Sequence, residues 1–259
     1  MLPIERHKYI LDLLRTQEFV RVPELSNILG VTEETIRRDI KFLAQNGDIK
    51  KTHGGAMLLE NAEKPLPMHN HEDIPFKKRI LQNTDLKHKI AALGVSLVKN
   101  GDTLMLDASS TTLVLVEYLK QKKNLTFLTN SIEIVYKYAN DPIYIISTGG
   151  SPKKNGLSLI GKVAMETISQ YNVDTLFMGC QGLDLNKGIT DSNEPDSTLK
   201  RCMMKQAEKI YLLVDSTKFN KVSFAKIADN TEITGIITDS KPSEEWLKYA
   251  SIHNIEIIY

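Results

Sequence analysis

The chain has 259 residues, with 33 Lys and Arg against 32 Asp and Glu, 41% hydrophobic residues and 2 cysteines. This composition excludes a disordered, fibrous or disulfide-stapled protein, and a chain of this length can bury a full core. Its apolar runs are strand-sized, and charges interrupt its first apolar stretch, so we expect a cytoplasmic protein without a membrane partner. A net charge of +1 does not suggest a nucleic-acid partner, but it is an average over the whole chain. Such an average hides local clusters of basic or acidic residues.

A polar, proline-containing stretch divides the chain. Three prolines and several acidic residues fall within residues 59–75, which show no apolar periodicity and read as a linker. We therefore expect two domains, residues 1–58 and 76–259, both of ordinary domain size. The linker's His69-Asn70-His71 could ligate a metal, but no helix or strand would orient it, so we expect no metal and no cofactor.

Apolar spacing in the first domain predicts helices. A helix near residues 4–14 comes first, and a short extended link follows at residues 20–22. Pro23 then opens a second helix, and Gly30 ends it where a left-handed backbone is easily adopted. Thr32 suits the N-cap of a third helix.

The third helix has an apolar face and a basic face. Ile36, Ile40 and Leu43 follow the i, i+4, i+7 spacing and must face inward, which turns Arg38 almost directly away from the core. Residues 48–55 could form a short hairpin after this helix. Two helices joined by a short turn with glycine, then a hairpin, make the layout of a winged helix-turn-helix.

Local charge supports DNA binding by this domain. Residues 37–53 hold five basic residues against two acidic ones, a surplus of three. Guanidinium groups suit both phosphates and guanine edges. A solvated basic face is the alternative for such a helix alone, but here the turn, the inward stripe and the basic hairpin coincide. The residues expected to bind double-stranded DNA are Thr32, Glu34, Thr35, Arg37, Arg38, Lys41, Lys50, Lys51 and His53.

The second domain alternates apolar runs of strand length with segments of helical period. This alternation is typical of an α/β domain with a mostly parallel sheet covered on both faces. The expected strands are residues 103–106, 125–128, 143–146, 175–178, 211–214, 235–237 and 255–258. The expected helices lie near residues 87–98, 112–120, 132–138, 162–170, 198–208 and 243–250.

Small polar residues follow several of these strands. After the first strand, a run of hydroxyl residues leads into a helix start, where backbone N–H groups and hydroxyls would form a phosphate cradle. Such residues are more often simple caps, but several strand ends of this kind should converge where ligands of parallel sheets bind. The residues expected at this site are Asp107, Ser109, Ser110, Thr111, Thr112, Thr129, Asn130, Gly149, Gly150 and Gly182.

Charged groups at this site should come from other segments. Asp215 closes a strand, and Lys218 follows three residues later, a spacing that lets the carboxylate orient the ammonium toward a bound phosphate or hydroxyl. Cys180 also falls near this edge, where a small side chain is the commoner reason for a cysteine than reactivity. Some carboxylates after Gly182 should hydrogen-bond hydroxyls of the ligand, and the candidates are Asp184, Asp191, Glu194 and Asp196.

The sequence resembles the DeoR family of bacterial transcription regulators. In the first domain the likeness is carried by Thr35-Ile36-Arg37-Arg38-Asp39 and His53-Gly54-Gly55-Ala56. It covers essentially the whole chain, and the second-domain segments that carry it are residues 106–112, 129–131, 149–150, 159–161, 179–184 and 214–219.

The resemblance implies a sensor domain related in fold to ribose-5-phosphate isomerase, in which a phosphorylated sugar binds and alters operator binding. It assigns Asp215 and Lys218 to the effector site, and Asp184 would belong there too. Arg79 and Lys87 match basic family positions that bear on the effector, although Arg79 could also be an exposed surface cation. The resemblance further implies a repressor of a carbohydrate-utilisation operon, released by the sugar phosphate, that forms a homodimer or homotetramer and is not an enzyme.

A sugar-phosphate isomerase-like enzyme that carries a DNA-binding module is the alternative. Isomerisation needs a positioned general base with a pKa near 7. The candidates for that base are Asp184, Asp191 and Glu194.

Overall fold

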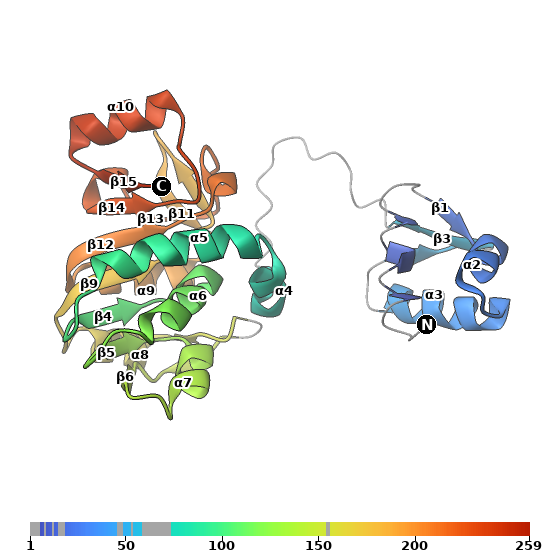
Figure 1. The fold of residues 1–259 in the computed structure, drawn as a ribbon, viewed down its shortest axis with the longest axis horizontal. Coiled ribbons are helices and arrows are strands. Elements are labelled where there is room, and N and C mark those ends of the chain that lie inside the picture. Colours follow the sequence, from blue (N-terminus) through green and yellow to red (C-terminus); the bar gives the residue numbers. More distant parts are fainter. Residues whose placement is uncertain are drawn as a thin grey trace. The chain divides into compact units, whose positions relative to one another are not determined.

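The chain folds into two compact units, residues 1–68 and 69–259 (Figure 1). The computed structural model describes residues 6–7, 9–11, 13–14, 19–45, 49–52, 54–58, 74–153 and 156–259. Residues 59–73 of the expected linker lie outside the described residues, so the domain boundaries at 58 and 76 stay a prediction. Within the described part of the chain, no helix combines the length and apolarity that a membrane span requires.

The first unit is a winged helix-turn-helix. The described residues between 6 and 14 are helical, as expected. The elements that follow are β1 (Phe19–Arg21), α2 (Val22–Leu29), α3 (Glu33–Gln45), β2 (Ile49–Lys51) and β3 (Gly55–Leu58). The three strands form an antiparallel sheet in the order β1-β3-β2. The expected extended link at residues 20–22 is confirmed at Val20 and Arg21, which pair with β3 as part of β1, whereas Val22 already begins α2.

The core of this unit confirms the predicted inward stripe of α3. Ile36, Ile40 and Leu43 are buried, and they pack in one cluster with Ile10 and Leu14 of the first helix. Residues at this spacing share one face of a helix, so α3 has to lie with that face on the core. Its opposite face is thereby turned to solvent.

The second unit contains a seven-stranded parallel sheet with the strand order β15-β14-β12-β9-β4-β5-β6 (Figure 1). Each of its strands was expected from the sequence, with ends that differ by up to four residues. The strands are β4 (Thr103–Leu106), β5 (Thr126–Thr129), β6 (Tyr144–Ser147), β9 (Val173–Met178), β12 (Ala207–Leu213), β14 (Gly235–Ile237) and β15 (Glu256–Ile258).

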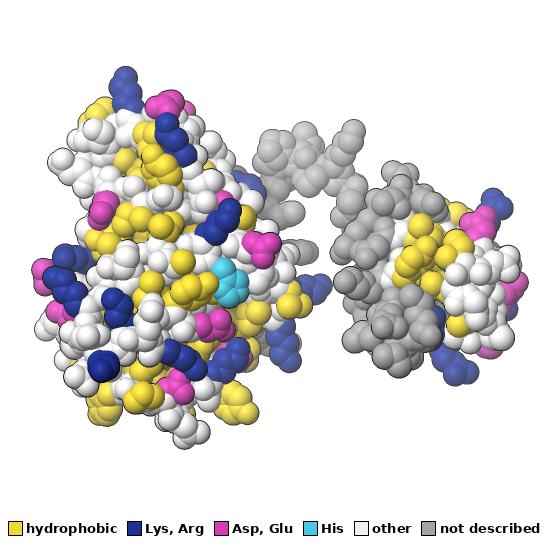
Figure 2. All heavy atoms as spheres, in the orientation of Figure 1, with side chains coloured by type: hydrophobic (Ala, Val, Ile, Leu, Met, Phe, Trp, Pro, Cys, Tyr) yellow, Lys and Arg dark blue, Asp and Glu magenta, His cyan; other side chains and the backbone are white. Residues whose placement is uncertain are grey.

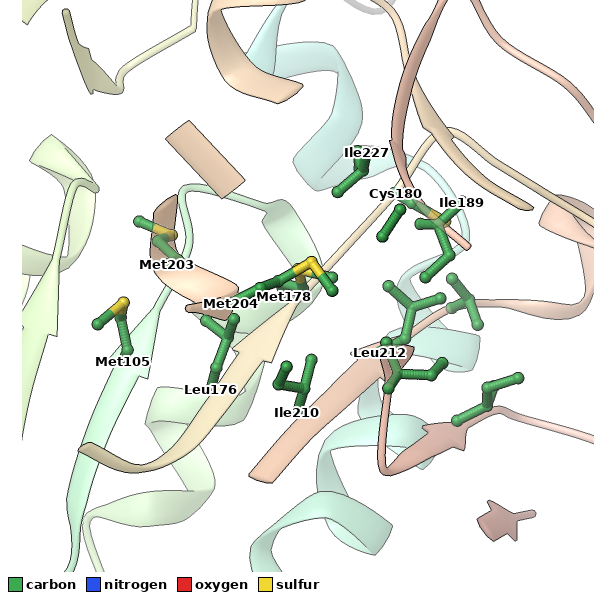
Figure 3. Packing of buried hydrophobic residues seen from close by; sticks show 14 of the residues in the cluster. Met105, Leu176, Met178, Cys180, Ile189, Met203, Met204, Ile210, Leu212 and Ile227 are labelled. Atoms are coloured by element: carbon green, nitrogen blue, oxygen red, sulfur yellow. The ribbon is translucent and has the colours of Figure 1, made fainter. Parts of the chain in front are cut away.

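Helices cover both faces of this sheet, as predicted. Neighbouring strand residues point to opposite faces, so Leu104 and Leu106 enter one core cluster and Met105 enters the other (Figure 3). The first cluster holds residues of α5 (Thr84–Gly94), which runs into η1 (Val95–Leu97), and of α6 (Ser110–Leu119) and α7 (Ile132–Tyr138). The second holds residues of α8 (Lys162–Ile168), α9 (Glu194–Met204) and α10 (Glu244–His253).

Short elements complete the unit and were not expected. They are α4 (Phe76–Leu81), the antiparallel pair β7 (Ser151–Pro152) and β8 (Leu159–Ile160), the antiparallel sheet of β10 (Gly182–Asp184), β11 (Gly188–Asp191) and β13 (Ala225–Ala228), and the turns η2 (Ser216–Lys218) and η3 (Asn230–Glu232). The helix expected at residues 198–208 is shifted, because the Asn193 side chain caps α9 and starts it at Glu194. Ala207 and Glu208 consequently belong to β12.

Candidate functional site

The turn between α2 and α3 is held by backbone and hydroxyl contacts. Gly30 ends α2 with a φ of 63°, in the left-handed region where glycine is favoured. Ser26 Oγ donates a hydrogen bond to the carbonyl of Val31 at 2.6 Å. Thr32 Oγ1 accepts the backbone N–H of Thr35 at 3.3 Å, which confirms Thr32 as the N-cap of α3. These contacts set the angle at which α3 leaves the turn.

The outward face of α3 carries the expected cations. Arg37, Arg38 and Lys41 are exposed, and so is Glu34 in the first turn. Arg37 donates to Glu33 one turn earlier at 2.6 Å, a surface pair that solvent screens. The side chains of Arg38 and Lys41 form no hydrogen bond or ion pair with any described residue.

Asp39 belongs to the opposite side of α3, which the charge count did not reveal. Its carboxylate accepts Arg6 Nε at 2.8 Å and Arg6 Nη2 at 3.1 Å, and His7 Nε2 lies 2.9 Å away. Burial acts to raise the pKa of Asp39, but the hydrogen bonds from Arg6 and His7 outweigh it and hold the pKa below its usual value. The position three residues after Ile36 could have signalled this burial. The outward face of α3 therefore lacks this negative charge.

The wing supplies further cations. Lys50 and Lys51 are exposed on β2, whereas His53 lies outside the described residues. Lys51 and Arg37 line a hollow between the wing, α3 and the start of α2. By contrast, Figure 2 shows Lys and Arg interspersed with Asp and Glu over one face of the second unit, so that face carries no continuous basic surface.

A cavity of the second unit, which we call the basic cavity, lies at the carboxyl ends of β4, β9 and β12. Strands of a parallel sheet end at one edge, which is where ligands of such sheets bind. Three cations line this cavity against one carboxylate, together with the start of α6. The expected site residues that it brings together are Arg79, Lys87, Ser109, Ser110, Thr111, Asp215 and Lys218.

Asp107 holds the strand ends around this cavity. One carboxylate oxygen accepts the N–H of Ser109 at 3.0 Å and the hydroxyl of Thr112 at 2.7 Å. The other accepts the N–H of Gly179 at 3.0 Å and lies 3.2 Å from Lys200 Nζ. Asp107, which follows β4, is 1% exposed, and its oxygens contact the start of α6, the residue after β9 and a lysine of α9. It therefore positions the site, while Ser109 both caps α6 and lines the cavity.

Lys87 lies inside α5 rather than at the start of the helix, and it is buried at 4% exposure. Its ammonium donates to the carbonyls of Arg79 and Gln82 at the end of α4. Burial lowers the pKa of Lys87 to about 8, with Asp215 raising it and Arg79 and Lys218 lowering it further. The ammonium is thus protonated at neutral pH, although it is largely shielded from solvent and lies near two other cations.

The expected pairing of Asp215 with Lys218 is wrong. Asp215 accepts the backbone N–H of Thr217 at 3.0 Å and also the hydroxyl of Thr217, which starts the turn η2. This turn directs the carboxylate back to its own backbone, and Lys218 Nζ instead donates to Gln181 Oε1 at 3.0 Å. Asp215 and Lys218 both line the basic cavity, and the Lys218 N–H donates to the Asp215 carbonyl at 3.0 Å, but their side chains do not bond each other.

A second cavity adjoins the first and shares Arg79, Ser109 and Gln181 with it. We call it the acceptor cavity, and it is lined by Asp107, Asn130, Ser158, Asp191, Asp196 and Lys200, among others. Lys200 was not anticipated, since its partners are far away in sequence. Its Nζ donates to the carbonyl of Gly179 at 2.7 Å and to Asp191 Oδ2 at 2.6 Å.

The remaining expected residues line neither cavity. Thr129 donates its hydroxyl to a β4 carbonyl at 2.7 Å, and Asp184 accepts two backbone N–H groups in the turn between β10 and β11. Gly150 has a φ of 107°, and a Cβ there would lie 2.6 Å from the carbonyl oxygen of Ile160. The residues in this group are Thr112, Thr129, Gly149, Gly150, Gly182, Asp184 and Glu194.

Cys180 serves packing, as expected. Burial is the largest effect on its thiol and raises its pKa to about 12, against a smaller lowering by Lys200. A thiol with this pKa is protonated and unreactive at neutral pH. Its side chain joins the core cluster in Figure 3. Within the described ranges, no group of three or more His, Cys, Asp or Glu could hold a metal ion, and His69 and His71 lie outside those ranges.

A winged helix-turn-helix unit with a basic outward helix, joined to an α/β unit, defines a DNA-binding regulator. The sequence pattern of the DeoR-like helix-turn-helix domain matches residues 6–62. The pattern of the DeoR C terminal sensor domain matches residues 82–240. The chain belongs to the DeoR family of transcriptional regulators.

Several relatives match almost end to end. The HTH-type transcriptional regulator GolR of Listeria innocua is 38% identical over 93% of this chain and 92% of its own length. The putative aga operon transcriptional repressor of Escherichia coli O157:H7 is 30% identical over 98% of this chain and 93% of its own. Ribose-5-phosphate isomerase A from Methanocaldococcus jannaschii resembles 53% of this chain with 55% of its own, at a TM-score of 0.40 and 20% identity, a likeness too weak to indicate a shared activity.

Proposed function

We propose that this protein represses a carbohydrate-utilisation operon and that a phosphorylated sugar in the basic cavity controls its affinity for operator DNA. The observation that carries the proposal is the convergence of Arg79, Lys87 and Lys218 on one cavity beside the start of α6. A doubly charged phosphate group suits three cations and free backbone N–H groups, and few other metabolite groups do. Family membership supports a regulatory role, and the repressor name of the E. coli relative agrees with the proposed sign.

In the proposed DNA complex, α3 enters the major groove. Thr35, Arg37 and Arg38 would meet base edges, with Thr32, Glu34 and Lys41 around them, while the wing residues Lys50, Lys51 and His53 bind backbone phosphates. A homodimer or homotetramer would place two such helices on paired half-sites. Effector binding changes operator affinity only if it favours one state of the protein over another.

A thermal-shift screen tests the effector. The full chain is heated with inorganic phosphate, with pentose and hexose phosphates, and with the same sugars without phosphate. A ligand that binds only the folded state raises Tm with its concentration, so we expect shifts with phosphosugars and none with the parent sugars. Equal shifts with and without phosphate would refute a phosphate site.

We propose no turnover. Glu194 is exposed, and hydrogen bonds from Thr198 and Arg201 hold its pKa below the usual value, which does not suit a base near neutral pH. Asp191 pairs with Lys200, and Asp184 closes a turn. Incubation with aldose and ketose phosphates should yield no interconversion. Conversion that Asp184→Asn abolishes would establish the enzymatic alternative.

A further inference from the structure

The acceptor cavity differs in charge from the basic cavity that it adjoins. The basic cavity has three cations against the single carboxylate of Asp215. The acceptor cavity has the carboxylates of Asp107, Asp191 and Asp196 against two cations, Lys200 and the shared Arg79, a surplus of one negative charge. A ligand that spans both cavities therefore meets positive charge at one end and hydrogen-bond acceptors with a negative surplus at the other.

Asn130 presents an unused acceptor in this second cavity. Its side-chain Nδ2 donates to the carbonyl of Leu159 at 3.1 Å, which sets the amide orientation, since only the NH₂ group can donate. Oδ1 is then left without a hydrogen-bond partner among the described residues, although it is buried and the residue is only 4% exposed. A buried acceptor without a hydrogen-bond partner destabilises the folded state. A ligand that donates a hydrogen bond to Oδ1 would remove this cost.

Two carboxylates of the cavity, Asp196 and Asp191, are each paired with a lysine ammonium. Asp196 accepts Lys153 Nζ at 2.5 Å and Asn193 Nδ2 at 2.9 Å. Burial acts to raise the pKa of Asp196, but the contacts with Lys153 outweigh it and hold the pKa low. Asp191 is paired in the same way with Lys200, as described above. Because these ammonium groups already have partners, they are not available to bind a second anion.

We propose that the acceptor cavity binds the uncharged hydroxyls of the effector and excludes effectors with a second anionic group. This inference rests on the proposed binding of phosphate in the basic cavity. A hydroxyl can donate to Asn130 Oδ1 and to a carboxylate, whereas a second phosphate or a carboxylate only accepts and is repelled there. The effector class is accordingly a monophosphate of a neutral polyhydroxy compound, and bisphosphates and phosphorylated sugar acids are excluded.

Calorimetric titration of the full chain with matched ligands tests this proposal. The pairs are fructose 6-phosphate with fructose 1,6-bisphosphate, glucose 6-phosphate with 6-phosphogluconate, and ribulose 5-phosphate with ribulose 1,5-bisphosphate. Inorganic phosphate serves as the reference for the basic cavity alone. We expect at least one monophosphate to bind more tightly than inorganic phosphate, and its doubly anionic counterpart to bind at least tenfold more weakly than it does.

Removing one negative charge should relax the exclusion. Asp196→Asn keeps the shape of the side chain and removes one negative charge from the cavity, so the preference for the monophosphate should shrink at least threefold. Asp141→Asn is the control, because Asp141 also pairs with a lysine, Lys120 at 3.0 Å, but precedes β6 at the amino-terminal edge of the sheet. It should leave the preference unchanged.

The outcomes separate the two proposals. Binding of neither inorganic phosphate nor any sugar phosphate would refute the phosphate site itself. Binding of phosphate without any gain from a sugar, or a doubly anionic ligand that binds as tightly as its monophosphate, would refute the acceptor cavity alone. A preference that Asp196→Asn leaves intact would also refute it.

Discussion

At the residue scale, several buried carboxylates of this protein form ion pairs that hold Arg or Lys side chains in place. Asp39 binds Arg6, and Asp107 and Asp191 hold Lys200. Burying a charge is tolerated only when it is paired and hydrogen-bonded, which these contacts provide. The cations without such partners, Arg38 among them, are then the ones available to ligands.

Arg38→Ala should weaken operator binding by about 10- to 100-fold, since one base or phosphate contact of a guanidinium is lost. Electrophoretic mobility shift at fixed salt measures this, and sugar-phosphate binding should be unaffected. Lys248→Ala, on an exposed helix position of the second unit, is the matched control. Unchanged DNA affinity of the Arg38 variant would show that α3 does not present this side to DNA.

Lys218→Ala should abolish the effect of sugar phosphate on operator binding and leave the operator affinity of the free protein unchanged. Its ammonium lies at the basic cavity with only Gln181 as a described side-chain partner, so the fold loses little. Lys221→Ala, three residues later and exposed, should respond normally. A normal response of the Lys218 variant to sugar phosphate would show that the phosphate does not bind beside Lys218.

The proposed phosphate binding beside Lys87 should depend on pH. Because the pKa of Lys87 is lowered to about 8, its ammonium loses a proton as the pH rises from 7 to 9. A bound anion favours the charged form, so phosphate affinity should fall over this range. Titration calorimetry should also detect proton uptake above pH 8. An affinity that stays constant from pH 7 to 9 would contradict a contact with Lys87.

At the element scale, polar contacts join two pairs of helices. Apolar packing is not directional, so these contacts fix the relative positions of the helices more closely than packing alone would. The Asp39 carboxylate ties α3 to the first helix. The Lys87 ammonium ties α5 to the last carbonyls of α4. Because α4 is the first described element after the expected linker and contributes Arg79 to both cavities, the proposed effector would contact it directly.

Asp39→Ala should destabilise the first unit by about 2 kcal/mol, because Arg6 loses a charge-assisted pair in a buried position. Chemical denaturation measures this change. Glu33→Ala, which breaks the exposed pair with Arg37, should cost well under 1 kcal/mol. Equal effects of the two changes would mean that the buried pair does not hold α3.

At the scale of the whole molecule, the first compact unit matches a helix-turn-helix domain and the second matches a sensor domain. The near-neutral total charge conceals a basic outward helix and wing in the first unit, which Asp39 does not offset because it is turned inward. Non-specific attraction to DNA should then be modest, and operator choice should depend on base contacts and paired half-sites.

Residues 69–259 expressed alone should fold and bind sugar phosphate with the affinity of the full chain, because both cavities are built within this unit. The same fragment should not bind operator DNA. Thermal shift and mobility shift measure the two properties. Loss of ligand binding in a folded fragment would show that the first unit contributes to the effector site.

The strands of the main sheet and most helices were predictable because their signal is local. An element with a buried face needs apolar residues at regular positions along the chain. Ile36, Ile40 and Leu43 show this spacing for a helix, and the run Thr103–Leu106 shows it for a buried strand. The short strands and α4 were missed, since two to six residues with polar ends carry no such period. Ser109, Ser110 and Thr111 were found because they follow a strand and begin a helix.

By itself, the sequence determined the two-domain order, the parallel α/β class, the outward basic face of α3 and the polar strand ends. Only the tertiary structure decided which polar groups meet: Asp39 with Arg6, Lys218 with Gln181 rather than Asp215, and Lys200 with Asp107 and Asp191. Apolar residues need only a buried face, which periodicity encodes along the chain. A charged residue needs one particular partner at hydrogen-bond distance, and that partner is set by which strand ends the sheet order brings together.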